Sequence, residues 1–178
     1  LSRYLDGIMI RTFKHSDVED LGRYGSVPVI NGLTDYNHPC QVMADMMSIQ
    51  EKFGKCERRK LCYVGDGNNM AVSLLFGAVK FGMDISIVSP ADYTIDRSLI
   101  AKVADEANER GCKVVLTESV EEGVSGAHAV YTDVWASMGQ EDESAKRMKA
   151  FEGFEVNSQV MSWADSDAIF MHCLPAHR

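Results

Sequence analysis

The chain has 178 residues, of which 46% are hydrophobic and 25% are charged, and this is the composition of an ordinary globular protein. A chain of this length buries about two-thirds of its unfolded surface, so neither disulfides nor a metal ion is needed to hold a core. Its 26 acidic and 18 basic residues give a net charge of −8. This charge argues against binding to nucleic acid, because phosphate contacts need a basic face.

The lengths of the apolar runs and the spacing of the cysteines indicate in which cellular compartment the protein is found. No apolar run approaches the roughly 20 residues that span a bilayer, and the N-terminal residues lack a signal-peptide pattern. Five cysteines are present and no two have C-x-x-C spacing, so we expect neither a disulfide framework nor a zinc site. These features favour a protein of the reducing cytoplasm with no membrane contact.

Short β-rich runs alternate with helical patterns along most of the chain. Strands are predicted, in chain order, at 7–13, 27–33, 61–65, 84–89, 113–117, 129–134 and 168–174. Helices are predicted at 40–53, 70–81 and 97–110, then after Ser119, and finally as an exposed helix within 137–149. The alternation predicts an α/β fold with a doubly wound, mostly parallel sheet and part of a second α/β domain.

The polar segment 54–60 is the predicted linker between these two domains. Only two strands and a helix are predicted before it, too few for a complete domain, whereas five strands and several helices follow it. We therefore expect residues 1–53 to be the C-terminal part of one domain together with a connecting helix. Residues 61–178 are expected to be a second, nearly complete domain.

Polar clusters follow several predicted strands, at the sheet edge where open α/β sheets bind ligands. The segment GDGNN at 65–69 lies between a strand and a helix. It lacks the third glycine of the dinucleotide fingerprint, and no ribose-binding acid follows the next strand, so a nicotinamide cofactor is disfavoured. The amide of Asn69 suits the carboxylate or amine of a small zwitterion, or alternatively caps the helix.

Two other positions suit anions. The segment NHPCQ at 37–41 precedes a helix, so His38 and Gln41 stand near its positive end, where a neutral imidazole can donate to a carbonyl oxygen. Capping with a solvated histidine is the alternative. Arg11 ends the first strand and suits a phosphate or carboxylate, or equally an ordinary surface ion pair.

An acid and a thiol end two later strands. Asp133 suits an ammonium group, with capping of a helix or loop as the alternative. Cys173 suits a thiolate where a helix terminus or a cation lowers its pKa. Buried packing is the more frequent role of a lone cysteine in a strand.

Four of these segments together resemble the ornithine branch of the aspartate/ornithine transcarbamylase family: NHPCQ at 37–41, GDGNNM at 65–70, DVWASMG at 133–139 and HCLPAH at 172–177. The resemblance runs through almost the whole chain. It implies transfer of a carbamoyl group from carbamoyl phosphate to the side-chain amine of ornithine, giving citrulline and phosphate, by a homotrimer without a cofactor or metal. It also implies that residues 1–53 belong to a carbamoyl-phosphate-binding domain and residues 61–178 to an ornithine-binding domain.

The resemblance distributes the candidate residues between the two substrates. It assigns carbamoyl phosphate to Arg11, His38, Gln41, Cys173 and the backbone carbonyl of Leu174, and ornithine to Asn69, Asp133, Ser137 and Met138. Catalysis falls to three of them, His38, Asp133 and Cys173. Asp133 and a Cys173 thiolate orient the amine and help to place its proton, while His38, together with Arg11, stabilises the developing oxyanion.

The sequence also departs from the family pattern. The Ser-Thr-x-Thr-Arg phosphate loop does not occur in it, and the helices that complete the first domain are absent. We therefore expect an internal segment with little or no turnover by itself. Two alternatives stay open, a putrescine or other diamine acceptor and a noncatalytic fragment that binds an amino acid.

Overall fold

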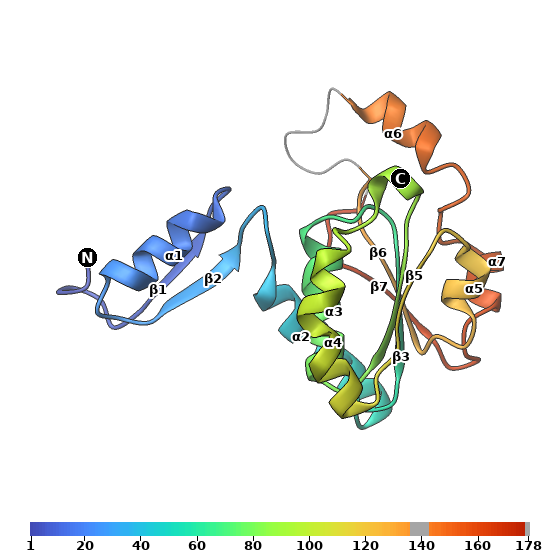
Figure 1. The fold of residues 1–178 in the computed structure, drawn as a ribbon, viewed down its shortest axis with the longest axis horizontal. Coiled ribbons are helices and arrows are strands. Elements are labelled where there is room, and N and C mark those ends of the chain that lie inside the picture. The colour runs from blue at the N-terminus through green and yellow to red at the C-terminus, as the bar shows by residue number, and fades with distance from the viewer. Residues whose placement is uncertain (136–142, 177–178) are drawn as a thin grey trace.

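The computed structural model describes residues 1–135 and 143–176 and contains a two-stranded and a five-stranded sheet (Figure 1). At the N-terminus, β1 (Ile8–Arg11), α1 (His15–Tyr24) and β2 (Val29–Leu33) form a β-α-β unit whose strands pair in parallel. The unit lies to one side of the main body and is joined to it by α2 (Pro39–Phe53). The helix α1 is not among the predicted helices, because it is short and mostly polar, although its few apolar residues lie on one side and Val18 is buried.

The main sheet contains β3 (Lys60–Val64), β4 (Asp84–Val88), β5 (Val114–Thr117), β6 (Ala129–Thr132) and β7 (Ile169–His172). Its strand order is β5-β4-β3-β6-β7 and every pair is parallel. The chain therefore moves outward from β3 in one direction and returns to the other side of β3 at β6. This reversal opens a crevice at the carboxyl ends of β3 and β6, where ligands bind in doubly wound sheets.

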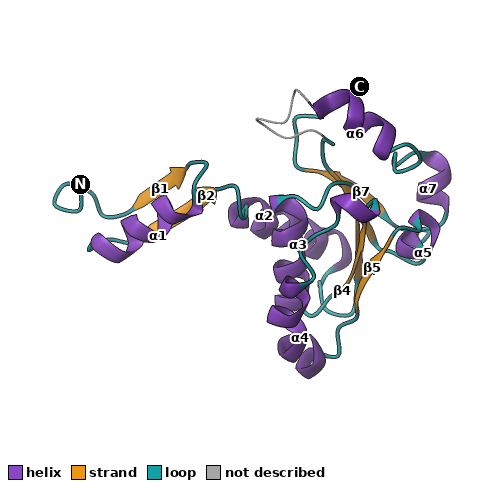
Figure 2. Cartoon of the chain, turned by 45° about the horizontal axis from the view of Figure 1, so that its top comes forward, coloured by secondary structure: helices purple, strands orange, loops and turns teal. Residues whose placement is uncertain are grey.

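Helices cover both faces of the main sheet (Figure 2). One face carries α2, α3 (Asn69–Lys80) and α4 (Ser98–Arg110), and the other carries α5 (Val120–Val124) and α7 (Ser158–Ser162). A 3-10 turn (Ala91–Tyr93) follows β4, and α6 (Ser144–Ala150) lies beyond the upper edge of the sheet.

The core is divided by the sheet into two clusters. Alternate residues of β3 face opposite sides, so that Leu61 and Tyr63 join the cluster under α2, α3 and α4, whereas Cys62 and Val64 join the cluster under α5 and α7. All four are fully buried. Such continuous burial is typical of central parallel strands, and the predicted doubly wound parallel sheet is confirmed.

Close packing of α2 against α3 sets the position of the helix that enters the site. The apolar face predicted for α2 is buried in the main cluster through Val42, Met46 and Ile49. Opposite Val42, α3 has Gly77, where a Cβ atom would overlap the Val42 side chain. The absence of a side chain at Gly77 therefore allows the two helices to approach closely.

The last predicted helix is partly correct. The helix α6 occupies 144–150, and the earlier part of the predicted polar segment, 137–142, lies outside the described residues. The prediction that this helix is exposed is wrong for Arg147, which is buried and forms an ion pair with Asp66. Among the described residues, no helix is long and apolar enough to cross a membrane.

Candidate functional site

A cleft of about 1070 Å³ opens at the carboxyl ends of β3, β6 and β7 and extends to the end of β1. Every predicted site residue that the structure describes lines this cleft: Arg11, His38, Gln41, Asn69, Asp133, Cys173 and Leu174. The other two, Ser137 and Met138, lie outside the described residues. Residues up to 163 positions apart along the chain thus meet in one cavity, because parallel strands all end at the same edge.

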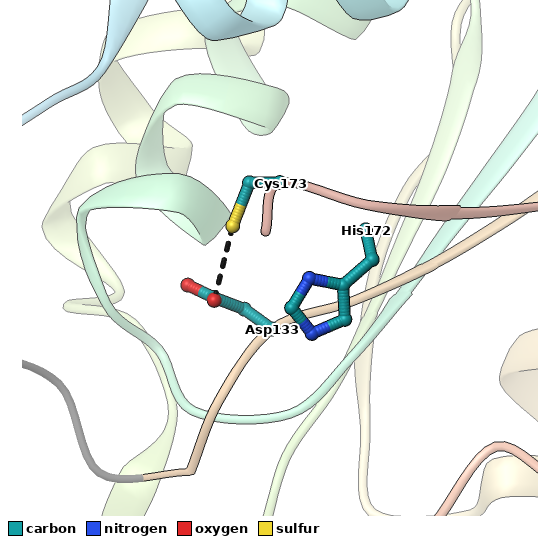
Figure 3. Close-up of side chains that lie close together, drawn as sticks. All are labelled: Asp133, His172 and Cys173. Carbon is teal, nitrogen blue, oxygen red and sulfur yellow. Dashed lines mark hydrogen bonds between the residues drawn. The ribbon is translucent and has the colours of Figure 1, made fainter. Parts of the chain in front are cut away.

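Three hydrogen bonds hold the Asp133 carboxylate in the cleft. Its Oδ2 accepts from the Asn68 amide at 2.8 Å, and its Oδ1 accepts from the Cys173 thiol at 3.0 Å (Figure 3) and from the backbone N–H of Val134 at 2.7 Å. Three donors from separate segments fix the carboxylate, which lines the cleft as a negative group. Asp133 is not the N-cap of the neighbouring described helices, because α3 and α6 have Asn68 and Glu143 as their N-caps.

The predicted thiolate at Cys173 is not what the structure favours. Burial raises the pKa of the Cys173 thiol above its ordinary range, and the hydrogen bond to Asp133 and the charge of Asp133 raise it further. Among the described residues no cation offsets these effects, so the sulfur carries its proton at neutral pH and donates it to Asp133. The Cys173 thiol thus helps to hold the Asp133 carboxylate in place.

In the cleft that Asp133 lines, His38 is a neutral hydrogen-bond donor and Arg11 is a positively charged one. Burial lowers the pKa of His38, and the charge of Arg11 lowers it further, while Asp133 opposes them with a smaller effect. The imidazole is therefore neutral at pH 7, and its buried Nδ1 has no hydrogen-bond partner among the described residues. It makes no capping bond to α2, and Arg11 forms no ion pair with any residue that the structure describes.

The two asparagines of the GDGNN segment have different tasks. Asn68, not Asn69, is the N-cap of α3, since its Oδ1 accepts from the N–H groups of Met70 and Ala71 at 2.9 and 3.2 Å. Asn69 donates from its amide to the carbonyl of Thr34 at 2.8 Å, which links α3 to the segment after β2. The alternative that Asn69 caps the helix is therefore wrong. Sequence reasoning overlooked Asn68, although its place directly before the helix is the usual cap signal.

A buried ion pair forms part of the lining of the cleft. Arg147 of α6 donates to Asp66 at 2.8 Å and to the carbonyl of Trp135 at 3.0 Å. The two charged side chains are only 8% and 9% exposed, and the Arg147 guanidinium lies 5.0 Å from the centre of the Tyr93 ring. No sequence pattern joins positions 66 and 147, so this pair is visible only in the fold.

Two further features lie beside Cys173. Leu174 has φ of 57°, a left-handed conformation that is uncommon for a residue with a branched side chain and often marks a functional site. His172 is near Asp133 and Cys173, and one potential ligand atom from each lies within 4.8 Å of the others (Figure 3). The Nδ1 of His172 already accepts from the N–H of Leu174 at 2.8 Å, so a metal ion would have to use its other nitrogen.

Comparisons with known proteins agree on one family. Residues 57–178 match the model "Aspartate/ornithine carbamoyltransferase, Asp/Orn binding domain", and residues 1–51 match the carbamoyl-P binding domain of the same family. The chain is 53% identical to an ornithine carbamoyltransferase of Carboxydothermus hydrogenoformans, over all of this chain and 57% of that protein, and 52% identical to one of Oceanobacillus iheyensis, over 55% of that protein.

A solved structure supports the same family. The ornithine carbamoyltransferase from Pyrococcus furiosus is 48% identical and superimposes with a TM-score of 0.94, over 99% of this chain and 56% of that one. The chain thus spans a little over half the length of the relatives that it matches. On the evidence of its fold, its cleft and both domain matches, the chain belongs to the aspartate/ornithine carbamoyltransferase family.

Proposed function

We propose that the protein containing this chain transfers the carbamoyl group of carbamoyl phosphate to the side-chain amine of L-ornithine, giving L-citrulline and phosphate. The observation that supports this most directly is the pairing of opposite groups in one cleft. Asp133, fixed by three hydrogen bonds, suits an ammonium group, while Arg11 and the neutral His38 suit an acyl phosphate. The two relatives that are 53% and 52% identical are both named ornithine carbamoyltransferase.

The chemistry follows from the charges of these groups. An alkylammonium has a pKa of about 10.4, so removing its proton at pH 7 costs about 4–5 kcal/mol. Asp133 binds and orients the ammonium, but as an opposite charge it favours the protonated form, so the amine must release one proton to solvent before it attacks. The free amine then attacks the carbamoyl carbon and a C–N bond forms. The C–O bond to phosphate breaks with its electron pair leaving on phosphate, which takes up the proton that the attacking nitrogen loses.

The donors opposite Asp133 act on the charge that this attack creates. The carbonyl oxygen becomes negative as the amine adds, and the N–H of the neutral His38 imidazole can donate a hydrogen bond to it. Arg11 holds the phosphate, whose charge increases as it leaves. Much of the rate then comes from holding two reactants in attack geometry rather than from a covalent intermediate.

The proposed residue roles continue those that the resemblance implies. We propose that Arg11, His38, Gln41 and Leu174 bind carbamoyl phosphate, and that Asn69, Asp133, Ser137 and Met138 bind ornithine, with Cys173 as a neutral thiol between them. The domain division at 54–60, with residues 1–53 and 61–178 on either side, is proposed with them. The matches to two domain models, which break between residues 51 and 57, support this division.

A homotrimer and a cytoplasmic location complete the proposal. Met43 and Met47 of α2 are 58% and 59% exposed, which supports burial of this helix face in the full-length assembly. All five cysteines are free, as expected in a reducing compartment. Sedimentation of the full-length protein checks the trimer.

Activity is tested with the full-length protein. Citrulline formation from carbamoyl phosphate and ornithine is compared with carbamoylation of putrescine under the same conditions. We expect ornithine to be the better acceptor, and we expect Asp133→Asn to abolish most of the turnover while carbamoyl phosphate still binds. Faster reaction with putrescine, or no reaction with either amine, would contradict the proposal.

A further inference from the structure

A buried carboxyl group that the proposed mechanism does not use lies directly beneath the cleft. Asp45 of α2 is 4% exposed and stands one helical turn after Gln41, on the same side of the helix. The Nε2 of Gln41 donates to Oδ1 of Asp45 at 3.0 Å. Gln41 lines the cleft, whereas Asp45 does not. The acid thus acts on the cleft only through the glutamine.

The chemistry of the two groups determines which end of the glutamine amide faces the cleft. A side-chain amide has a donor end and an acceptor end, and without a partner both orientations are accessible. An ionised carboxylate can only accept hydrogen bonds. The NH₂ of Gln41 must therefore face Asp45, and the carbonyl oxygen of Gln41 is left as an acceptor for a ligand.

Asp45 is mostly ionised at pH 7 although it is buried, because two neighbouring donors offset part of the effect of burial. Burial raises the pKa of Asp45 to about 6, while the Gln41 amide and the nearby Tyr131 hydroxyl lower it. Tyr131 on β6 and Cys173 after β7 are the titratable groups that face Asp45 from the sheet, and raised pKa values keep both neutral. Oδ2 of Asp45 has no hydrogen-bond partner among the described residues, so Gln41 is the donor that it has.

We infer that Asp45 is a positioning residue that holds the Gln41 amide with its oxygen toward the cleft, and that it thereby selects an acyl phosphate whose acyl group carries an N–H. The inference rests on the proposed function, because the acyl phosphate in question is carbamoyl phosphate. Acetyl phosphate has the same phosphate and carbonyl but a methyl group in place of the NH₂. It therefore cannot donate to Gln41.

The test uses this pair of ligands with the full-length protein. Dissociation constants for carbamoyl phosphate and acetyl phosphate are measured by calorimetry, without ornithine, for the wild type and for Asp45→Asn. The asparagine offers Gln41 a donor as well as an acceptor, so it no longer holds the amide in one orientation and allows NH₂ to face the ligand. We expect binding of carbamoyl phosphate to weaken severalfold, and binding of acetyl phosphate to change by less than about twofold.

Two control variants separate positioning from a general structural effect. Asp105→Asn removes an exposed acid of α4, away from the cleft, and should leave both constants unchanged. In a Gln41→Met background, where no amide remains to be oriented, Asp45→Asn should cause no further loss of selectivity. Equal weakening of both ligands by Asp45→Asn would overturn the inference, because a distorted cleft, and not a turned amide, produces that result.

Selectivity should also depend on pH. Below the pKa of about 6, a protonated Asp45 can donate to the Gln41 oxygen, so the preference of the wild type for carbamoyl phosphate should fall on acidification. Titration of the phosphate group is shared by both ligands and cancels in their ratio. Asp45→Asn should show no such fall.

The two proposals fail in different ways. If the wild type does not bind carbamoyl phosphate, the proposed function is overturned and this inference with it. If the wild type binds and prefers carbamoyl phosphate but Asp45→Asn keeps the full preference, only the role of Asp45 is overturned.

Discussion

Replacing Arg147 with methionine should destabilise the protein strongly, because the change leaves a charge behind in the core. Arg147 and Asp66 are joined at 2.8 Å with 8% and 9% of their side chains exposed. Breaking a buried pair from one side costs about 3–5 kcal/mol, most of it from the uncompensated partner. The Trp135 carbonyl also loses the donor that it has in Arg147.

The pH dependence of this loss identifies its cause. Burial raises the pKa of Asp66 while Arg147 lowers it, so the pKa rises further in Arg147→Met. A group whose pKa is higher in the folded than in the unfolded state binds more protons when folded, and stability falls as the pH rises through its folded pKa. The deficit of the variant should therefore be full at high pH and should shrink on acidification, as Asp66 becomes neutral.

The assay is urea or thermal unfolding of the full-length variants at several pH values. Lys80→Met is the matched control, because it removes a cation at 3.1 Å from Glu106 where the lysine is 62% exposed, and such surface pairs contribute about 0–1 kcal/mol. Asp66→Asn combined with Arg147→Met should recover part of the loss. If Arg147→Met were no less stable than Lys80→Met, or lost stability equally at every pH, the reasoning from a buried charge would be refuted.

Three shorter predictions concern the cleft and the core. Alkylation of Cys173 by iodoacetamide at pH 8, followed by mass spectrometry, should be much slower than alkylation of the exposed Cys40. Asp133→Asn should accelerate the reaction of Cys173 by lowering the pKa of its thiol. Equal rates at the two cysteines would contradict a neutral thiol. Asn68→Ala should cost about 1 kcal/mol or more in unfolding experiments, since it removes a helix cap, and should also lower the turnover by freeing Asp133. Gly77→Ala should cost about 1–3 kcal/mol by forcing two helices apart, and an unchanged unfolding midpoint would exclude that contact.

The order of the elements was largely predictable because it depends on local patterns. The buried runs at β3 and β4 and the apolar stripe of α2 are each contained in a short stretch of sequence. The helix α1 escaped prediction because it is short and mostly polar, and the few apolar residues on its one apolar side are a weak signal in so short a segment. The edge of the sheet at which the polar clusters gather followed from the parallel topology alone.

The sequence by itself determined the α/β architecture, the strand ends that carry polar groups, and the resemblance from which the candidate residues were assigned. Only the tertiary structure decided how those residues act. The protonation of Cys173 depends on burial and on an acid 40 positions away, and the orientation of Gln41 depends on the charge state of Asp45, which the fold removes from water. Charge states and hydrogen-bond directions are set by distance and solvent exposure in space, and these quantities exist only once the chain has folded.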